Sequence, residues 1–239
     1  MVRHCYCVLV QVFSFAEEEE LIAKNPMDKV ACPKIQKKKV DALSETDAAR
    51  LLSVIPSAPI DFRCMLYLLV TTGIRRGELL GLKWGDFDFA SRTVKVRRNV
   101  AYSSTEGLLI GTPKTQAGVR DIPLLSFVVE ELLSYKASTP KHGNDMFVFP
   151  ADASGQSPRN PGALTHRVKR FMKSNGFPDM SPHDLRHTCA TLLISAGADI
   201  KSVQEILGHT DASTTLNFYV STDMDRLRSA TERLATILK

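Results

Sequence analysis

The sequence predicts a mainly α-helical protein with one small antiparallel β-sheet, an α+β fold. Two observations lead to this prediction. Residues 92–100 alternate valine with basic side chains, which is typical of a half-buried strand, and segments 112–115 and 119–122 flank a plausible hairpin turn at 116–118. The other segments repeat apolar residues at helical spacing, so helices are expected near 44–55, 60–72, 78–82, 125–136, 161–175, 182–196, 200–207, 213–219 and 222–238.

The chain begins with a pattern that predicts a helix from about Tyr6 to Ala23. It should end before Pro26, because a residue that precedes proline avoids helical dihedrals. A signal peptide is the alternative interpretation of the apolar run. Gln11 interrupts that run, however, and the helical pattern continues past the supposed cleavage site, so the helix is favoured.

Residues 26–43 are predicted to form a linker that separates this helix from a larger unit over 44–239. The linker carries the basic run 37–39, which either is a solvated connector or lies along a phosphate backbone. Ser44 begins the larger unit as a helix N-cap, with Asp47 placed as in a capping box.

The composition is that of a water-soluble protein, with 44% hydrophobic and 24% charged residues in 239. A net charge of +5 is compatible with a polyanionic partner but does not establish one. The five cysteines form no CxxC pair, which favours free thiols in a reducing compartment such as the cytoplasm. No apolar stretch reaches the length of a membrane span.

Two basic residues in the first half of the larger unit are candidate catalytic residues. Arg75 lies between the helix stop Gly73 and Glu78, whose carboxylate can hold the guanidinium by a charge-assisted hydrogen bond. The alternative is an ordinary surface ion pair. Lys114 lies at the edge of the expected hairpin, where it could reach a leaving oxygen, although exposed lysines are common.

The segment SPHDLRHT predicts a well-formed helix start, with Ser181 as N-cap and proline at the first helical position. His183 then lies in the first turn, where free N–H groups attract anions, and Arg186 follows one turn later on the same face. A zinc site made by His183 and His187 is the competing interpretation. It is disfavoured because Arg186 would place a positive charge beside the metal.

Two further candidates lie near the C-terminus. His209 follows the helix breaker Gly208, and Tyr219 comes ten positions later. Taken singly, His209 looks like a loop residue and Tyr219 like a core residue. Together with the residues above they supply cations for phosphate oxygens, proton donors for a leaving oxygen and a nucleophile, which is what a phosphodiester transition state requires.

These residues, in this order and with these flanks, closely resemble the tyrosine site-specific recombinases, or phage integrase family. The resemblance covers about residues 40–239 and rests on the segments TTGIRRGELLGLKWGDFDF, TPKTQAGVRDIPL and SPHDLRHTCATLLISAGADIKSVQEILGHTDASTTLNFYV. It implies that family's catalytic-domain fold. It also implies a double-stranded DNA partner and a reaction without cofactor or metal.

The resemblance implies a role for each candidate. Tyr219 would attack the scissile phosphate to give a 3′-phosphotyrosyl enzyme, and Lys114 would protonate the leaving 5′-oxygen. His183 would act as general acid/base on the tyrosine proton, and His209 would donate a hydrogen bond to the phosphoryl group. The two arginines, Arg75 and Arg186, would bind the non-bridging oxygens, with Glu78 supporting the first of them.

The N-terminal region departs from the family pattern. Family members carry a complete helical core-binding domain before the linker, whereas residues 1–25 correspond to its last helix alone. The helix at 222–238 would dock on a neighbouring protomer in a homotetramer on DNA, or else pack on its own domain. The favoured function is integration or excision of a mobile element. The alternatives are a truncated, non-catalytic DNA-binding regulator and, less favoured by the spacing, a type IB topoisomerase.

Overall fold

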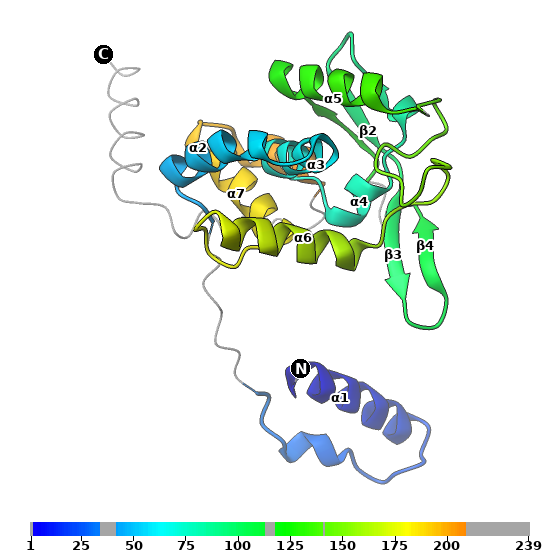
Figure 1. The fold of residues 1–239 in the computed structure, drawn as a ribbon. Coiled ribbons are helices and arrows are strands. Elements are labelled where there is room, and N and C mark those ends of the chain that lie inside the picture. Colours follow the sequence, from blue (N-terminus) through cyan, green and yellow to red (C-terminus); the bar gives the residue numbers. More distant parts are fainter. Residues whose placement is uncertain (1, 34–41, 113–117, 141, 209–239) are drawn as a thin grey trace, which may run out of the picture. The chain divides into compact units, whose positions relative to one another are not determined.

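The computed structural model describes residues 2–33, 42–112, 118–140 and 142–208. The chain divides into two compact units, residues 1–40 and residues 41–239. Figure 1 shows the elements of both units. The predicted helices at 213–219 and 222–238 lie outside the described residues. None of the described helices is long and apolar enough to cross a membrane.

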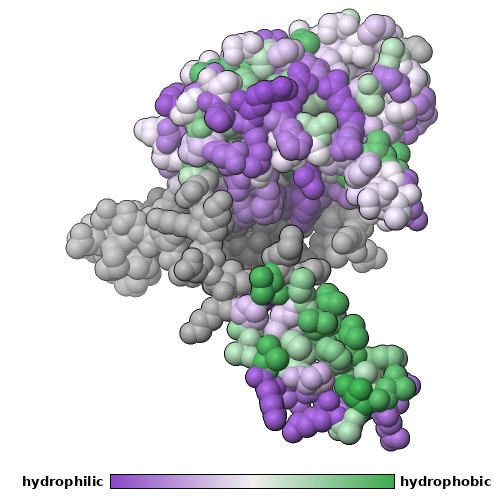
Figure 2. All heavy atoms as spheres, turned by 60° about the horizontal axis from the view of Figure 1, so that its bottom comes forward, coloured by the Kyte–Doolittle hydropathy of each residue, from purple (hydrophilic) through white to green (hydrophobic). Residues whose placement is uncertain are grey.

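The first unit contains one α-helix, α1 (Val2–Glu18), followed by a short 3-10 helix, η1 (Pro26–Lys29). The helix α1 begins four residues before the predicted start and ends five before the predicted end, and Glu20 just beyond it has a left-handed φ of 58°. Asn25 caps η1, accepting a 2.9 Å hydrogen bond from the Met27 N–H. Large hydrophobic side chains of α1 are exposed, and Figure 2 shows them gathered on this unit in green.

The second unit is mainly helical with two small antiparallel sheets, in agreement with the predicted fold class. Its described α-helices and β-strands are, in chain order, α2 (Glu45–Val54), α3 (Ile60–Thr72), α4 (Arg76–Leu80), β1 (Phe87–Asp88), β2 (Thr93–Val96), β3 (Asn99–Ser103), β4 (Gly107–Gly111), β5 (Arg120–Pro123), α5 (Ser126–Ser138), α6 (Pro161–Ser174), α7 (Pro182–Ser195) and α8 (Ile200–Leu207).

The core of this unit is built around α3, which contacts α5 and α7. Nine of its thirteen residues are buried, because apolar side chains occupy every face of this helix rather than a single stripe. It ends at Gly73 in a left-handed conformation, as predicted. The C-terminal end of α3 therefore lies inside the unit, close to α7 and α8.

The sheets differ from the prediction. The expected strand over 92–100 is two strands, β2 and β3, which belong to different sheets. The chain breaks between them because Arg98 turns inward, donates to the Gly81 carbonyl at 2.9 Å and pairs with the Asp86 carboxylate. The first sheet has the order β1-β2-β5, and the second is the hairpin β3-β4.

Only the second strand of the hairpin predicted around 116–118 can be compared with the structure. That strand corresponds to β5, which pairs with β2, with Val96 opposite Arg120 and Val94 opposite Ile122. The observed hairpin joins β3 to β4 with its turn near 104–106. Residues 113–117, which include most of the proposed turn, lie outside the described residues.

Candidate active site

The structure describes four of the seven predicted site residues. All four lie in the second unit. Arg75 is the N-cap of α4 and Glu78 lies within α4, whereas His183 and Arg186 lie on α7. The other three, Lys114, His209 and Tyr219, lie outside the described residues.

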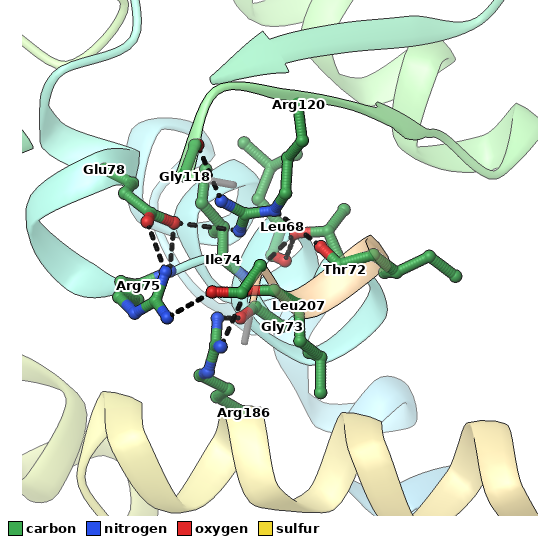
Figure 3. A network of polar contacts seen from close by, with 12 residues as sticks. Leu68, Thr72, Gly73, Ile74, Arg75, Glu78, Gly118, Arg120, Arg186 and Leu207 are labelled. Carbon is green, nitrogen blue, oxygen red and sulfur yellow. Dashed lines mark hydrogen bonds and ion pairs between the residues drawn. The ribbon is translucent and has the colours of Figure 1, made fainter. Parts of the chain in front are cut away.

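Arg75 is held by the helix that it precedes. It is the N-cap of α4, and Glu78 accepts from both its backbone N–H at 3.1 Å and its Nη1 at 2.7 Å. Figure 3 shows the Arg75 side chain pointing toward the Glu78 carboxylate. The Nη2 of Arg75 donates to the Gly208 carbonyl at 2.7 Å. The Arg75 side chain is 40% exposed, so this hydrogen-bonded cation is accessible to solvent.

Glu78 joins two arginines. Its side chain is only 3% exposed, and its Oε2 also accepts from Arg120 Nη2 at 2.9 Å. Burial by itself would raise the pKa of Glu78, but the hydrogen bonds and charges of Arg120 and Arg75 outweigh that effect and hold the pKa below its ordinary value of 4.5. The carboxylate is therefore ionised at neutral pH and neutralises part of the arginine charge.

Arg186 is a buried cation that lies between two helix ends. Its Nη1 donates to the Gly73 carbonyl at the end of α3 at 2.6 Å, and its Nη2 donates to the Leu207 carbonyl at the end of α8 at 2.7 Å. Carbonyls at helix C-termini carry partial negative charge and stabilise a cation. Burial and the charge of Arg75 lower the pKa of Arg186 to about 9, so it remains protonated at neutral pH.

Gly73 allows this meeting of helices. Its φ of 61° favours glycine, and a Cβ there would lie 2.4 Å from Leu207 Cδ2. A larger residue would therefore require the buried Leu207 side chain, or the end of α8 with it, to move.

His183 lies in the first turn of α7, as predicted. Ser181 caps this helix and forms a capping box with Asp184. The ring of His183 is exposed and contacts the His187 ring edge-to-face, with centroids 4.3 Å apart. Partial desolvation and the charges of Arg186 and Arg75 lower the pKa of His183 below its usual 6.5, which keeps the ring neutral and able to accept a proton at neutral pH.

An open cavity of about 730 Å³ brings three of the predicted residues together, because Arg75, His183 and Arg186 all line it. The N-terminal turns of α6 and α7 border the same cavity, so free backbone N–H groups add to its positive character. Residues of β3 also line the cavity. The cavity is suited to an anionic group, with fixed cations and a neutral imidazole around it.

Sequence reasoning missed Arg120. Its side chain is 7% exposed, and besides Glu78 it donates through Nε to the Ile206 carbonyl at 2.7 Å. A signal was present, because Arg120 alternates with Asp121 and shares the buried face of β5 with Ile122. A charged residue at an inward strand position needs a buried partner.

Comparisons of the sequence identify relatives of this chain. The model of the phage integrase family matches residues 41–226. The tyrosine recombinase XerC of Bacillus pumilus is 33% identical over 229 residues, which cover 90% of this chain and 68% of that protein. The ICEBs1 integrase of Bacillus subtilis is 24% identical over 238 residues, which cover 96% of this chain and 64% of that protein.

The fold has relatives among solved structures. The integrase of transposon Tn1549, in complex with transposon right end DNA, is similar with a TM-score of 0.78 and 30% identity, covering 96% of this chain and 78% of that one. Against several curated relatives, including the ICEBs1 integrase, the chain spans less than two thirds of their length. The family match, the XerC identity and the shared fold together show that this chain belongs to the phage integrase family and contains a tyrosine recombinase catalytic domain.

Proposed function

We propose that this chain is a site-specific DNA recombinase that cleaves and rejoins DNA strands through a 3′-phosphotyrosyl intermediate, in the integration or excision of a mobile element. The observation that carries the proposal is the cavity in which Arg75 and Arg186 accompany a neutral His183. Both guanidiniums are fixed by hydrogen bonds before any DNA is bound. Preorganised cations of this kind stabilise a phosphoryl transition state without reorganisation.

The two arginines would bind the non-bridging oxygens of the scissile phosphate. Within the described part of the chain, each uses one N–H of Nη1 and one of Nη2 in contacts with the protein. A guanidinium has further N–H groups, including Nε–H, which can face a phosphate in the cavity. Glu78 would keep Arg75 in place while negative charge develops on the phosphoryl oxygens.

The proposed step is a transesterification. The phenol oxygen of Tyr219 forms a bond to phosphorus as the bond to the 5′-oxygen breaks, so the phosphodiester energy is kept in the new ester. The phenol proton passes to His183, Lys114 gives a proton to the departing 5′-oxygen, and His209 donates a hydrogen bond to the phosphoryl group. Attack by the free 5′-hydroxyl of another strand reverses these steps and completes the exchange.

The partners follow from this reaction. Double-stranded DNA is the substrate, and a homotetramer formed through the helix predicted at 222–238 would bring four strands together. Side-chain cations supply the charge neutralisation, so the step requires no metal ion or cofactor. The cytoplasm is the expected compartment, in keeping with five cysteines that all remain free thiols.

The test is a phosphotyrosyl trap. Nicked duplexes selected by the wild-type chain from a randomised pool would be incubated with wild type, Tyr219→Phe and the control Tyr6→Phe, which removes a phenol from the first unit. We expect a covalent adduct with wild type and Tyr6→Phe, and DNA binding without adduct for Tyr219→Phe. Adduct formation by Tyr219→Phe would show that the nucleophile is wrongly assigned. Binding without adduct for the wild type would favour the alternative, a non-catalytic DNA-binding regulator.

A further inference from the structure

The last turn of α8 is held by three arginines from three different elements. The carbonyls of three consecutive residues, 206 to 208, each accept a 2.7 Å hydrogen bond, from Arg120 Nε, Arg186 Nη2 and Arg75 Nη2 respectively. The last carbonyls of a helix lack partners within the helix, and their partial negative charge attracts cations. The end of α8 is therefore a common acceptor for β5, α7 and the N-cap of α4.

Arg120 differs from the other two arginines in its surroundings. Arg75 and Arg186 line the cavity, whereas Arg120 is not among the described residues that line it. Its guanidinium instead donates hydrogen bonds to Glu78 and to the carbonyls of Gly118 and Ile206. Direct contact with a phosphate in the cavity is therefore not its role in this arrangement.

The contacts of Arg120 connect two parts of the proposed site. Its Nη2 donates to Glu78 Oε2 at 2.9 Å, and the same carboxylate holds Arg75 through Oε1. Its Nε holds the Ile206 carbonyl, two residues before Gly208. Figure 3 shows the Arg120 guanidinium beside the Glu78 carboxylate, with Arg75 and Arg186 below them. One planar guanidinium thus links the support of a phosphate-binding cation to the end of α8.

We infer that Arg120 is a positioning residue for strand transfer, which fixes the end of α8 relative to Arg75. The inference rests on the proposed function. His209 is bonded directly to Gly208, and Tyr219 follows ten positions after His209. Anchoring residues 206–208 therefore fixes the position at which the segment that contains His209 and Tyr219 begins. In enzymes a misplacement of about 1 Å can lower a rate by about 100-fold.

The experiment uses Arg120→Met, Arg120→Lys and the matched control Asp121→Asn. Asp121 is the next residue on β5 but is exposed, with a 3.8 Å surface ion pair to Lys95. Thermal unfolding identifies the variants that fold. Hydrogen exchange of residues 200–207 then reports on the anchoring of α8. Binding of selected nicked duplexes and the single-turnover rate of adduct formation at saturating DNA separate affinity from chemistry.

We expect Arg120→Met to exchange α8 amides faster, to bind DNA as wild type does and to form adduct about 10- to 100-fold more slowly. Arg120→Lys keeps the charge but cannot reach both Glu78 and the Ile206 carbonyl, so its rate of adduct formation should lie between those of wild type and Arg120→Met. Asp121→Asn should match wild type in all three measurements. If Arg120→Met does not fold, Arg120→Lys carries the same comparison.

Two results would overturn the inference while leaving the proposed function intact. One is faster exchange in α8 with a wild-type adduct rate, which would make Arg120 purely structural. The other is a rate loss that disappears at saturating DNA, which would make it a DNA-binding residue. Absence of adduct from the wild-type chain itself would instead refute the proposed function, and this inference with it.

Discussion

Replacing Glu78 by glutamine removes the carboxylate that links Arg75 to Arg120. The side chain is 3% exposed and accepts hydrogen bonds from the Arg75 backbone, Arg75 Nη1 and Arg120 Nη2. Glutamine is similar in volume but presents a neutral amide, so Arg120, itself 7% exposed, keeps a buried charge without a counter-ion. Removing one partner of a buried ion pair costs about 3 to 5 kcal/mol.

The loss that we expect is about 3 kcal/mol, at the lower end of that range, because Arg75 is partly exposed to solvent. For a unit of about 200 residues the entropy of unfolding is roughly 0.4 kcal/mol per degree, so Tm should fall by about 7 °C. Differential scanning calorimetry at neutral pH measures this shift. Glu106→Gln, which changes an exposed carboxylate, is the matched control and should change the free energy of unfolding by less than about 0.5 kcal/mol.

The pH dependence gives a second measurement. The pKa of Glu78 is held below 4.5 in the folded protein, so its contribution to stability is complete above the unfolded pKa and is lost as the pH falls through the folded pKa. The difference in unfolding free energy between wild type and Glu78→Gln should therefore be largest at neutral pH and shrink in acid. A Tm shift no larger than that of Glu106→Gln, or a difference that persists unchanged in acid, would refute this reasoning.

Three further changes test other parts of the site. Gly73→Ala should destabilise the protein by more than Gly176→Ala in urea unfolding, because both glycines have positive φ but only Gly73 would bring a Cβ to 2.4 Å from Leu207 Cδ2; equal losses would contradict the close approach. The rate of adduct formation should be maintained below pH 6.5, because the pKa of His183 is lowered and its ring remains a neutral base there. The variant His183→Gln should lack the acidic limb of the pH–rate profile. Lys114→Ala should lose adduct formation on ordinary DNA but recover it when sulfur replaces the leaving 5′-oxygen, since a thiol, with a pKa of about 8.5, leaves without protonation; no recovery would exclude the proposed acid role.

Local signals in the sequence predicted the parts of the site that local contacts build. The start of α7 follows from Ser181 and the proline after it, and the end of α3 follows from Gly73. Arg75 and Glu78 are three residues apart, so their ion pair was expected and is confirmed. In each case the partners lie within one helical turn, where spacing alone determines what can touch.

The features that sequence reasoning missed depend on distant partners. Arg120 meets Glu78 from 42 residues away and the Ile206 carbonyl from 86. A backbone acceptor has no side-chain signature, so nothing in the sequence names it. The strand prediction over 92–100 failed for the same reason, because the inward turn of Arg98 toward Asp86 is set by the tertiary structure. Alternation gave the correct faces of β2 but not its neighbour in the sheet.

The hydrogen bonds of Arg186 to the Gly73 and Leu207 carbonyls have a consequence for how this chain tolerates substitution. Both acceptors are peptide groups, which every amino acid supplies, so no point replacement at either position deletes them. Such a replacement can weaken the grip on the guanidinium only by displacing the main chain. In random mutagenesis, the substitutions that weaken these hydrogen bonds should therefore be those that change side-chain bulk where α3 and α8 meet, and not those that remove a polar side chain.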